Sequence, residues 1–303
     1  MTELVRTKHL TEEEWRQWRN QGIGGSDAAV IMGVNPWKSQ MDLWLEKTGE
    51  FSEDIDNEAM HWGRTLEDIV AREWSQRTGK KIRRRNAILR HPDHAWMLAN
   101  VDRLVINERA GLEVKTTNAF YQDDGSVPPH YYAQVQHYMA VTGLDLWYVA
   151  VLVGGQRLVS YEVPRNEEYI DALIELEWEF WQLVQTKAPP ELDGSEASSK
   201  VVSRMYPHAK EEETQLPGDA FSLVQQYEEA AEEERAAKLR KDEAANKLKA
   251  LMGDAEKGFI YDRKVSWANV KSSRFDTKNF KKDHEDLYKE YARESQYRRF
   301  QIK

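Results

Sequence analysis

The chain has 303 residues, enough for one large domain or two ordinary ones, and 40% of them are hydrophobic, as in a folded protein with a sizeable core. Cysteine is absent, which excludes disulfides, thiolate zinc sites, cysteine nucleophiles and cysteine-ligated iron–sulfur clusters. The net charge of -9 does not exclude nucleic acid as a partner, because affinity for DNA depends on local phosphate contacts.

The apolar residues are distributed as in a cytoplasmic protein without a membrane span. No run approaches the roughly 18 consecutive apolar residues of a membrane helix, and the first residues form no apolar signal segment. Without cysteine or clustered histidine, a catalytic metal has to be held mainly by oxygen, which favours Mg²⁺ or Mn²⁺. Basic residues gather at 80–85 and near the end of the chain, although a solvated charged face explains either cluster equally well.

The first 190 residues have the pattern of one mixed domain. Four helices are expected before the first strand, each placed by a capping residue at its start or a glycine at its end. They start at Thr11, at Ser26 or Asp27 as the cap of residues 28–32, at Ser39 with an end at Gly49, and near Glu58 with an end at Gly79.

Strand patterns follow these helices. Runs rich in β-branched and aromatic residues predict strands at 81–89, 96–106, 112–117, 147–153 and 158–164. Helical periodicity returns over 129–142 and 166–186. Helices that flank a mixed central sheet give an α/β or α+β sandwich.

Composition changes after residue 190. We predict a domain over 1–190, a linker over 191–218 that is rich in Pro, Gly and Ser at its start, and a C-terminal extension over 219–303. The extension combines an amphipathic helix that ends at Gly253, a small β-hairpin within 258–270 and a basic, aromatic tail.

Asp102 and the tripeptide Glu113-Val114-Lys115 form the most informative pattern, with ten residues between Asp102 and Glu113. Alternate residues of a strand share a face, so Glu113 and Lys115 point the same way while Val114 points into the core. An antiparallel neighbour that carries Asp102 brings a second carboxylate beside Glu113. Two carboxylates and the Val114 carbonyl suit Mg²⁺, and Lys115 can orient or deprotonate the attacking water.

This spacing alone is weak, because an exposed cross-strand ion pair produces it too. The apolar flanks favour a functional site, since charges in a buried sheet need partners or a metal.

Two helical motifs add polar groups. Arg64 and Glu67 share a helix face, which makes Glu67 a candidate third carboxylate and Arg64 its partner or a phosphate ligand, with an ordinary ion pair as the alternative. Gln134 and Tyr138 also share a face and are candidates to bind a phosphate or to hold catalytic groups. A tyrosine that simply packs in the core is an equally good alternative.

The chain resembles the YqaJ-like viral recombinases, which group with phage lambda exonuclease in the PD-(D/E)XK nuclease superfamily. The resemblance rests on residues 22–29, 33–39 and 42–49 and on the motifs above in the same order, over about residues 12 to 185. One departure is Val101, where the superfamily has proline before the aspartate. The carboxylate carries the chemistry, so the departure affects recognition more than mechanism.

The resemblance implies a restriction-endonuclease-like core and assigns roles to single residues. Asp102 and Glu113 are then metal ligands, Lys115 is the catalytic lysine, Glu67 is an auxiliary acid and Gln134 contacts the substrate. Arg19 and Ser26, seven residues apart, match an arginine and a serine that hold the DNA 5′-phosphate. A guanidinium and a hydroxyl at a helix start form a suitable phosphate cradle.

The function implied is a Mg²⁺- or Mn²⁺-dependent exonuclease with two metal ions. It degrades one strand of duplex DNA in the 5′→3′ direction and leaves 3′ overhangs for phage-type recombination. The resemblance also implies a ring-shaped homotrimer, a single-strand annealing protein as partner, and a phage or prophage origin in a bacterial host. Two alternatives stay open: a structure- or site-specific endonuclease on the same core, and an inactive DNA-binding phage protein.

Overall fold

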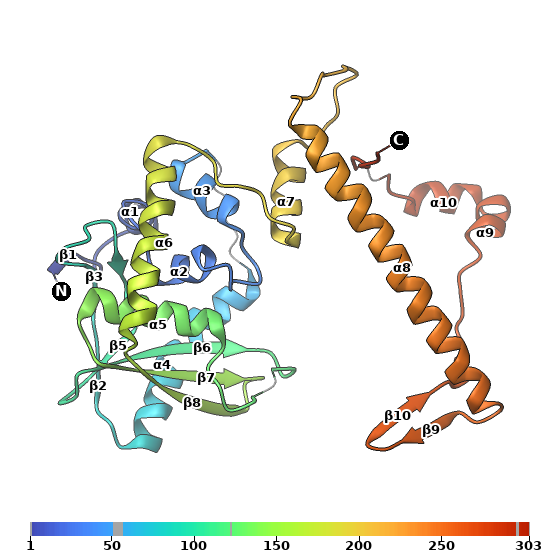
Figure 1. The fold of residues 1–303 in the computed structure, drawn as a ribbon. Helices are drawn as coiled ribbons and strands as arrows, with labels where there is room; N and C mark the ends of the chain where they lie inside the picture. The colour runs from blue at the N-terminus through green and yellow to red at the C-terminus, as the bar shows by residue number, and fades with distance from the viewer. Residues whose placement is uncertain (1, 51–56, 122, 295–296, 303) are drawn as a thin grey trace. The chain divides into compact units, whose positions relative to one another are not determined.

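The computed structural model describes residues 2–50, 57–121, 123–294 and 297–302. The chain divides into two compact units, Met1–Met205 and Tyr206–Lys303 (Figure 1). A five-stranded sheet of order β2-β5-β6-β7-β8 lies at the centre of the first unit. Its strands are β2 (Ile82–Arg84), β5 (Arg103–Val105), β6 (Ala110–Thr117), β7 (Leu146–Val153) and β8 (Arg157–Pro164). Only β6 and β7 are parallel, so the mixed central sheet predicted from the sequence is confirmed.

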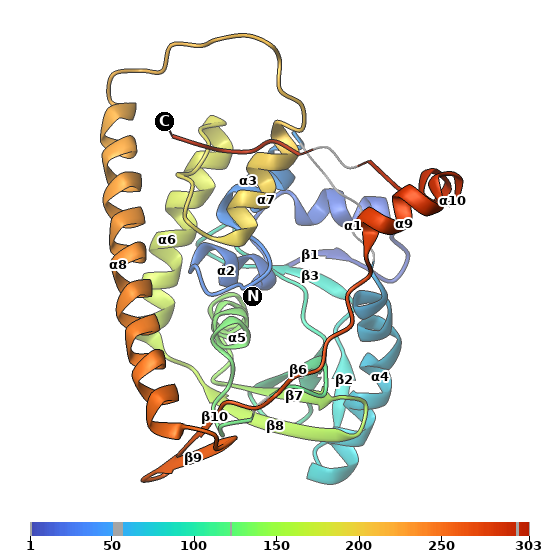
Figure 2. The ribbon, with the colours of Figure 1, turned by 90° about the vertical axis from the view of Figure 1, so that its right-hand side faces the viewer.

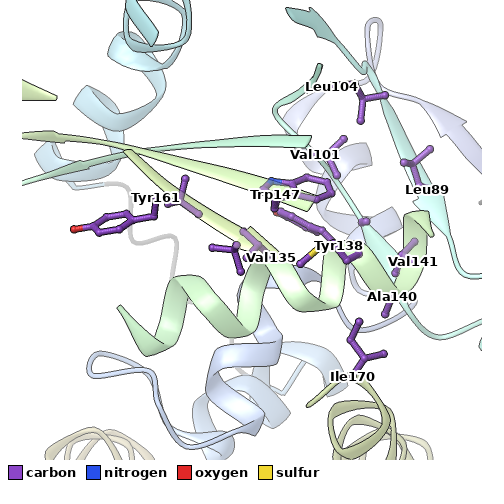
Figure 3. Close-up of a cluster of buried hydrophobic side chains, with 14 of the residues drawn as sticks. Leu89, Val101, Leu104, Val135, Tyr138, Ala140, Val141, Trp147, Tyr161 and Ile170 are labelled. Atoms are coloured by element: carbon purple, nitrogen blue, oxygen red, sulfur yellow. The ribbon is translucent and has the colours of Figure 1, made fainter. Parts of the chain in front are cut away.

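Helices cover both faces of this sheet because its inner strands are apolar on both sides (Figures 1 and 2). On β7, Trp147, Val149 and Val151 belong to the core cluster of α5 (Pro129–Thr142), and Tyr148 and Ala150 belong to that of α4 (Glu58–Thr78). Figure 3 shows the α5 side, where the rings of Tyr138 and Trp147 pack at 5.2 Å between centroids.

A smaller antiparallel sheet adjoins the first, with order β1-β3-β4. Its strands are β1 (Thr2–Arg6), β3 (Ala87–Arg90) and β4 (Leu98–Ala99). The predicted strand 96–106 is therefore two strands, β4 and β5, that pair in different sheets. The predicted strand 81–89 is divided in the same way between β2 and β3, and β1 has no counterpart among the predicted strands.

Five further helices complete the first unit: α1 (Glu12–Arg19), α2 (Gly25–Ile31), α3 (Gln40–Thr48), α6 (Glu167–Thr186) and α7 (Glu196–Met205). The predicted caps Thr11 and Ser39 are confirmed, as are the predicted ends at Gly49 and Gly79. The cap of α2 differs, because the helix starts after Gly24, and Asp27 accepts the Gly24 N–H at 2.9 Å from inside its first turn. In the described parts of the chain, no helix is both apolar and long enough to span a membrane.

Helix α7 lies inside the range predicted as a linker. Asp193 accepts hydrogen bonds from the hydroxyls of Ser195 and Ser198 at 2.6 and 2.5 Å, which stabilises the start of the helix. Val201 is buried in the cluster that includes Leu43 and Phe180. A Ser-rich stretch thus forms a packed helix, held by the buried Val201 and Ser198 and by the ion pair of Arg204 with Asp42 of α3.

The second unit is built on one long helix, α8 (Ala220–Met252), and none of its described side chains is buried. A hairpin of β9 (Lys257–Ile260) and β10 (Arg263–Ser266) follows, then α9 (Thr277–Asp283) and α10 (Glu285–Tyr291). Near the end of the chain Arg298 donates to the Tyr206 carbonyl at 3.3 Å, and the rings of Phe300 and Tyr227 meet edge to face.

Candidate active site

Two acidic side chains meet where β5 joins β6. Asp102 lies just before β5, whose first residue, Arg103, pairs with Leu112 of β6. The Val114 N–H donates to Oδ2 of Asp102 at 2.9 Å, which fixes this carboxylate beside Glu113. Because the Asp102 side chain occupies this donor, the ladder breaks here, and the break explains why 96–106 does not form one strand.

Glu113 is held from two sides through one oxygen. Its Oε1 accepts hydrogen bonds from Lys115 Nζ at 2.8 Å and from Gln134 Nε2 at 2.7 Å. Gln134 also donates to the Tyr138 hydroxyl at 2.9 Å. The other oxygen, Oε2, is buried and has no hydrogen-bond partner. A buried carboxylate oxygen without a donor is costly unless a cation binds it, so this atom fits a metal ligand.

The charges around Asp102 also favour a bound cation. Burial raises the pKa of Asp102 well above its ordinary value, and the nearby carboxylates of Glu113 and Glu67 raise it further. Burial opposes the charge on Lys115, but Glu113 and Asp102 outweigh it and leave the pKa of Lys115 above its ordinary value. The amine is therefore a cation at neutral pH, and ionisation of Asp102 is unfavourable unless a further cation binds beside it.

Oxygen donors of this kind suit Mg²⁺ or Mn²⁺. Over the described ranges, no group of three or more His, Asp or Glu side chains is placed to hold a metal ion. Asp102 and Glu113 supply two side-chain ligands, so backbone, water and substrate oxygens have to complete the coordination. The Val114 carbonyl, next to Glu113 on β6, is the backbone candidate.

Glu67 belongs to a charge network around the buried Arg103, which the sequence motifs do not predict. Arg103 is buried and donates to Glu67 Oε1 at 2.8 Å and to the Asp102 carbonyl at 2.6 Å, and it also pairs with Asp68. Glu67 therefore lies near Asp102, with Arg103 as a partner. Arg64 is exposed on the same helix, three residues before Glu67. An arginine next to Asp102 in an apolar run was the signal for such a partner.

Arg19 and Ser26 are brought together at the start of α2. The Arg19 guanidinium donates to Ser26 Oγ at 3.0 Å and lies 3.5 Å from Asp27. Lys47 pairs with the same aspartate at 2.8 Å and is buried. Burial would raise the pKa of Asp27, but Lys47 and Arg19 together hold it well below its ordinary value. Asp27 thus positions the guanidinium while the Ser26 hydroxyl stays available for a ligand.

One cavity of about 190 Å³ is lined both by the Asp102–Glu113 pair and by Arg19 and Ser26. Six of the predicted site residues line it: Arg19, Ser26, Asp102, Glu113, Gln134 and Tyr138. Trp15 and Asn100 also line it and were not predicted. Trp15 lies one helical turn before Arg19, with its ring 4.8 Å from the guanidinium carbon, and this i, i+4 spacing was a usable signal.

The cavity depends on a close approach between α2 and α5. A Cβ atom at Gly25 would lie 2.4 Å from the Tyr138 ring, so only glycine allows this contact. The glycine-rich start of α2 therefore places Ser26 in the same cavity as Gln134 and Glu113.

Comparisons with known proteins give matches at the level of the family and the fold. Residues 14–145 match the model of the YqaJ-like viral recombinase domain. The protein YqaJ of Bacillus subtilis (strain 168) is 40% identical over 308 residues, which cover 99% of this chain and 97% of YqaJ.

Among solved structures, the alkaline exonuclease LHK-Exo of Laribacter hongkongensis aligns with a TM-score of 0.50 at 20% identity, over 65% of this chain and 100% of that enzyme. Its complex with dAMP aligns equally well, at 21% identity over 64% of this chain and 98% of that enzyme. The chain therefore shares the fold of this enzyme, and the predicted restriction-endonuclease-like core is confirmed. With a relative that matches along almost the whole sequence, the chain belongs to the YqaJ-like viral recombinase family.

Proposed function

We propose that this protein is a Mg²⁺-dependent exonuclease that degrades one strand of duplex DNA in the 5′→3′ direction and leaves a 3′ single-stranded overhang. The observation that carries the proposal is the pair of the half-buried Asp102 and the buried Glu113. Glu113 Oε2 has no hydrogen-bond partner, and the Lys115 amine contacts Glu113 Oε1. Nuclease chemistry needs such an excess of negative charge to bind cations and an amine to assist water.

Each residue has a defined task in this proposal. Asp102, Glu113 and the Val114 carbonyl would hold two divalent ions, which supply positive charge to the phosphate and lower the pKa of water. Lys115 orients the attacking water and donates a hydrogen bond to the developing negative charge. Gln134 fixes the Glu113 carboxylate, Tyr138 supports Gln134, and Glu67 serves as an auxiliary acid near Asp102.

The proposed polarity rests on Arg19 and Ser26. Their guanidinium and hydroxyl line the same cavity as the two carboxylates, so a phosphate bound there places the adjoining phosphodiester near Glu113. A terminal 5′-phosphate, with chain on one side only, fits a cavity of this size better than a phosphate within a continuous strand. The Laribacter relative is an alkaline exonuclease and forms a complex with dAMP, which agrees with a nucleotide-sized cavity.

Digestion of labelled DNA tests the proposal. A linear duplex carrying a different label at each end of one strand, and a closed circle of the same sequence, are incubated with Mg²⁺, with Ca²⁺ or with EDTA. We expect the 5′ label to be lost first from the linear duplex with Mg²⁺, little loss with Ca²⁺ and none with EDTA, while the circle stays intact. Cleavage of the circle would instead favour the endonuclease alternative.

The Arg19→Ala variant tests the phosphate cradle. Wild-type protein is expected to degrade a 5′-phosphorylated duplex faster than a 5′-hydroxyl duplex, and the variant is expected to lose that preference, because a charge-assisted hydrogen bond to the phosphate is removed. The measurement is the ratio of initial rates on the two substrates. Arg16→Ala, on the exposed side of α1 with Glu12 as a partner, is the matched control and should keep the wild-type ratio.

The second unit is proposed to make protein contacts. None of the described side chains of α8 is buried, and several are large and apolar, including Phe221, Tyr227, Leu239 and Leu251. We propose that this helix contacts other copies in a homotrimer or the single-strand annealing protein. The double variant Leu239→Glu, Leu251→Glu should then lose one of two contacts: trimer formation, measured by sedimentation, or capture of the annealing protein. Its digestion of short duplexes should continue. If neither contact changes, α8 has another role.

A further inference from the structure

A row of aromatic rings leads from Lys115 to the protein surface. The Lys115 amine lies 5.4 Å from the centre of the Tyr131 ring. Tyr131 and His130 have ring centroids 4.1 Å apart, and His130 meets Trp37 edge to face at 5.2 Å. The row therefore begins at a residue that contacts Glu113 and ends at Trp37.

The outer end of the row is open to solvent. Trp37 is 71% exposed, whereas His130 and Tyr131 are half-buried in the first turn of α5. The turn that carries Trp37 is fixed, because Asn35 Oδ1 accepts the N–H groups of both Trp37 and Lys38 at 2.8 and 2.9 Å. An exposed indole on a fixed turn loses little conformational entropy when it binds a flat ligand.

The inner part of the row carries two features that suit a nucleotide. Lys115 supplies a positive charge next to the Tyr131 ring, and His130 Nε2 is buried with no hydrogen-bond partner. The row lies outside the set of residues that line the cavity with Arg19 and Ser26. A strand with its terminal phosphate in that cavity and a phosphodiester at Glu113 would then meet the row with its following nucleotides.

We propose that Trp37, His130 and Tyr131 form a stacking surface for unpaired bases of the strand being degraded. This inference rests on the proposed nuclease function and adds the part of the substrate that the rings bind. Every base has a flat π-face, so stacking on aromatic rings holds a strand without sequence preference. The cation beside the innermost ring favours the phosphate backbone and disfavours a purely apolar protein segment as the occupant.

Binding to DNA with a single missing base tests this proposal. A 5′-phosphorylated duplex carries one abasic site, moved one position at a time from the 5′ end, and its affinity is measured by fluorescence anisotropy with Ca²⁺ in place of Mg²⁺. Wild type is expected to lose about 5- to 30-fold in affinity at one or two adjacent positions, the effect of one lost base stack. Trp37→Ala should bind the intact duplex more weakly by a similar factor, and no abasic position should weaken its binding further. Trp37→Phe should restore both the affinity and the sensitive position.

Trp178→Ala is the matched control. Trp178 lies on α6, is 44% exposed and packs against another ring, that of Trp96, with 4.5 Å between the ring centroids. It should keep the wild-type profile. If Trp37→Ala keeps the same abasic profile as wild type, the stacking surface is wrong, although wild-type protein that still degrades duplex with Mg²⁺ leaves the proposed function standing. If wild type neither binds nor degrades DNA, both proposals are wrong.

Discussion

Lys115→Ala is expected to lower the rate of phosphodiester hydrolysis about 10³-fold while the protein stays folded and binds DNA. The reason is that Lys115 places a cationic donor against Glu113, at the point where the phosphate gains negative charge. The loss should appear in the maximal rate more than in the KM for duplex, since the amine acts mainly on the transition state. Single-turnover digestion of end-labelled duplex measures it.

Lys80→Ala is a closely matched control for this experiment. Lys80 is exposed to a similar extent, pairs with Glu108 at 2.6 Å and lies 5.1 Å from the Tyr148 ring, as Lys115 pairs with Glu113 and lies over Tyr131. It should retain nearly wild-type rates. A Lys115→Ala variant that digests DNA within a few-fold of wild type would remove this lysine from the chemistry.

Asp102→Asn is expected to abolish activity and, without metal, to make the protein more stable than wild type. The carboxylates of Asp102 and Glu113 repel each other, and desolvation also raises the pKa of Asp102. Asparagine removes one of the charges and keeps an oxygen that accepts the Val114 N–H. The unfavourable free energy of placing these two carboxylates side by side is offset when cations bind.

Thermal unfolding with and without Mg²⁺ measures both parts of this prediction. Saturating metal at about 100 times its Kd should stabilise wild type by about 2.7 kcal/mol and leave the variant unchanged. Asp145→Asn, an exposed aspartate paired with Arg109, should respond to metal like wild type. An Asp102→Asn variant that is less stable without metal and still gains stability from Mg²⁺ would contradict the assignment.

The sequence predicted most helices and the faces of the central strands, because these follow from local periodicity. Alternation over Glu113, Val114 and Lys115 predicted Val114 in the core, and the structure confirms it by placing Val114 in the same cluster as Trp74. The strand containing Asp102 was predicted too long, because its break depends on one side chain capturing the Val114 N–H from another strand. Such a contact between distant residues leaves no periodic signal.

The site was predictable where a motif marks it and missed where charges pair across elements. Arg103 joins β5 to α4 through Glu67 and Asp68, and Asn100 lines the cavity from the loop before β5. The roles proposed for Arg64 and Tyr138 in substrate binding stay predictions. The hydrogen bond from Gln134 favours a supporting role for Tyr138 instead.

The proposed mechanism depends on cations bound at Asp102 and Glu113, and diffraction from crystals grown with Mn²⁺ locates them. Anomalous scattering should give one or two peaks, each about 2.0–2.2 Å from oxygens of Asp102, Glu113 or Val114, the usual range for small divalent ions. Crystals of Glu113→Gln should lose them. Strong peaks elsewhere, or none between these residues in a preparation that digests DNA, would contradict the account.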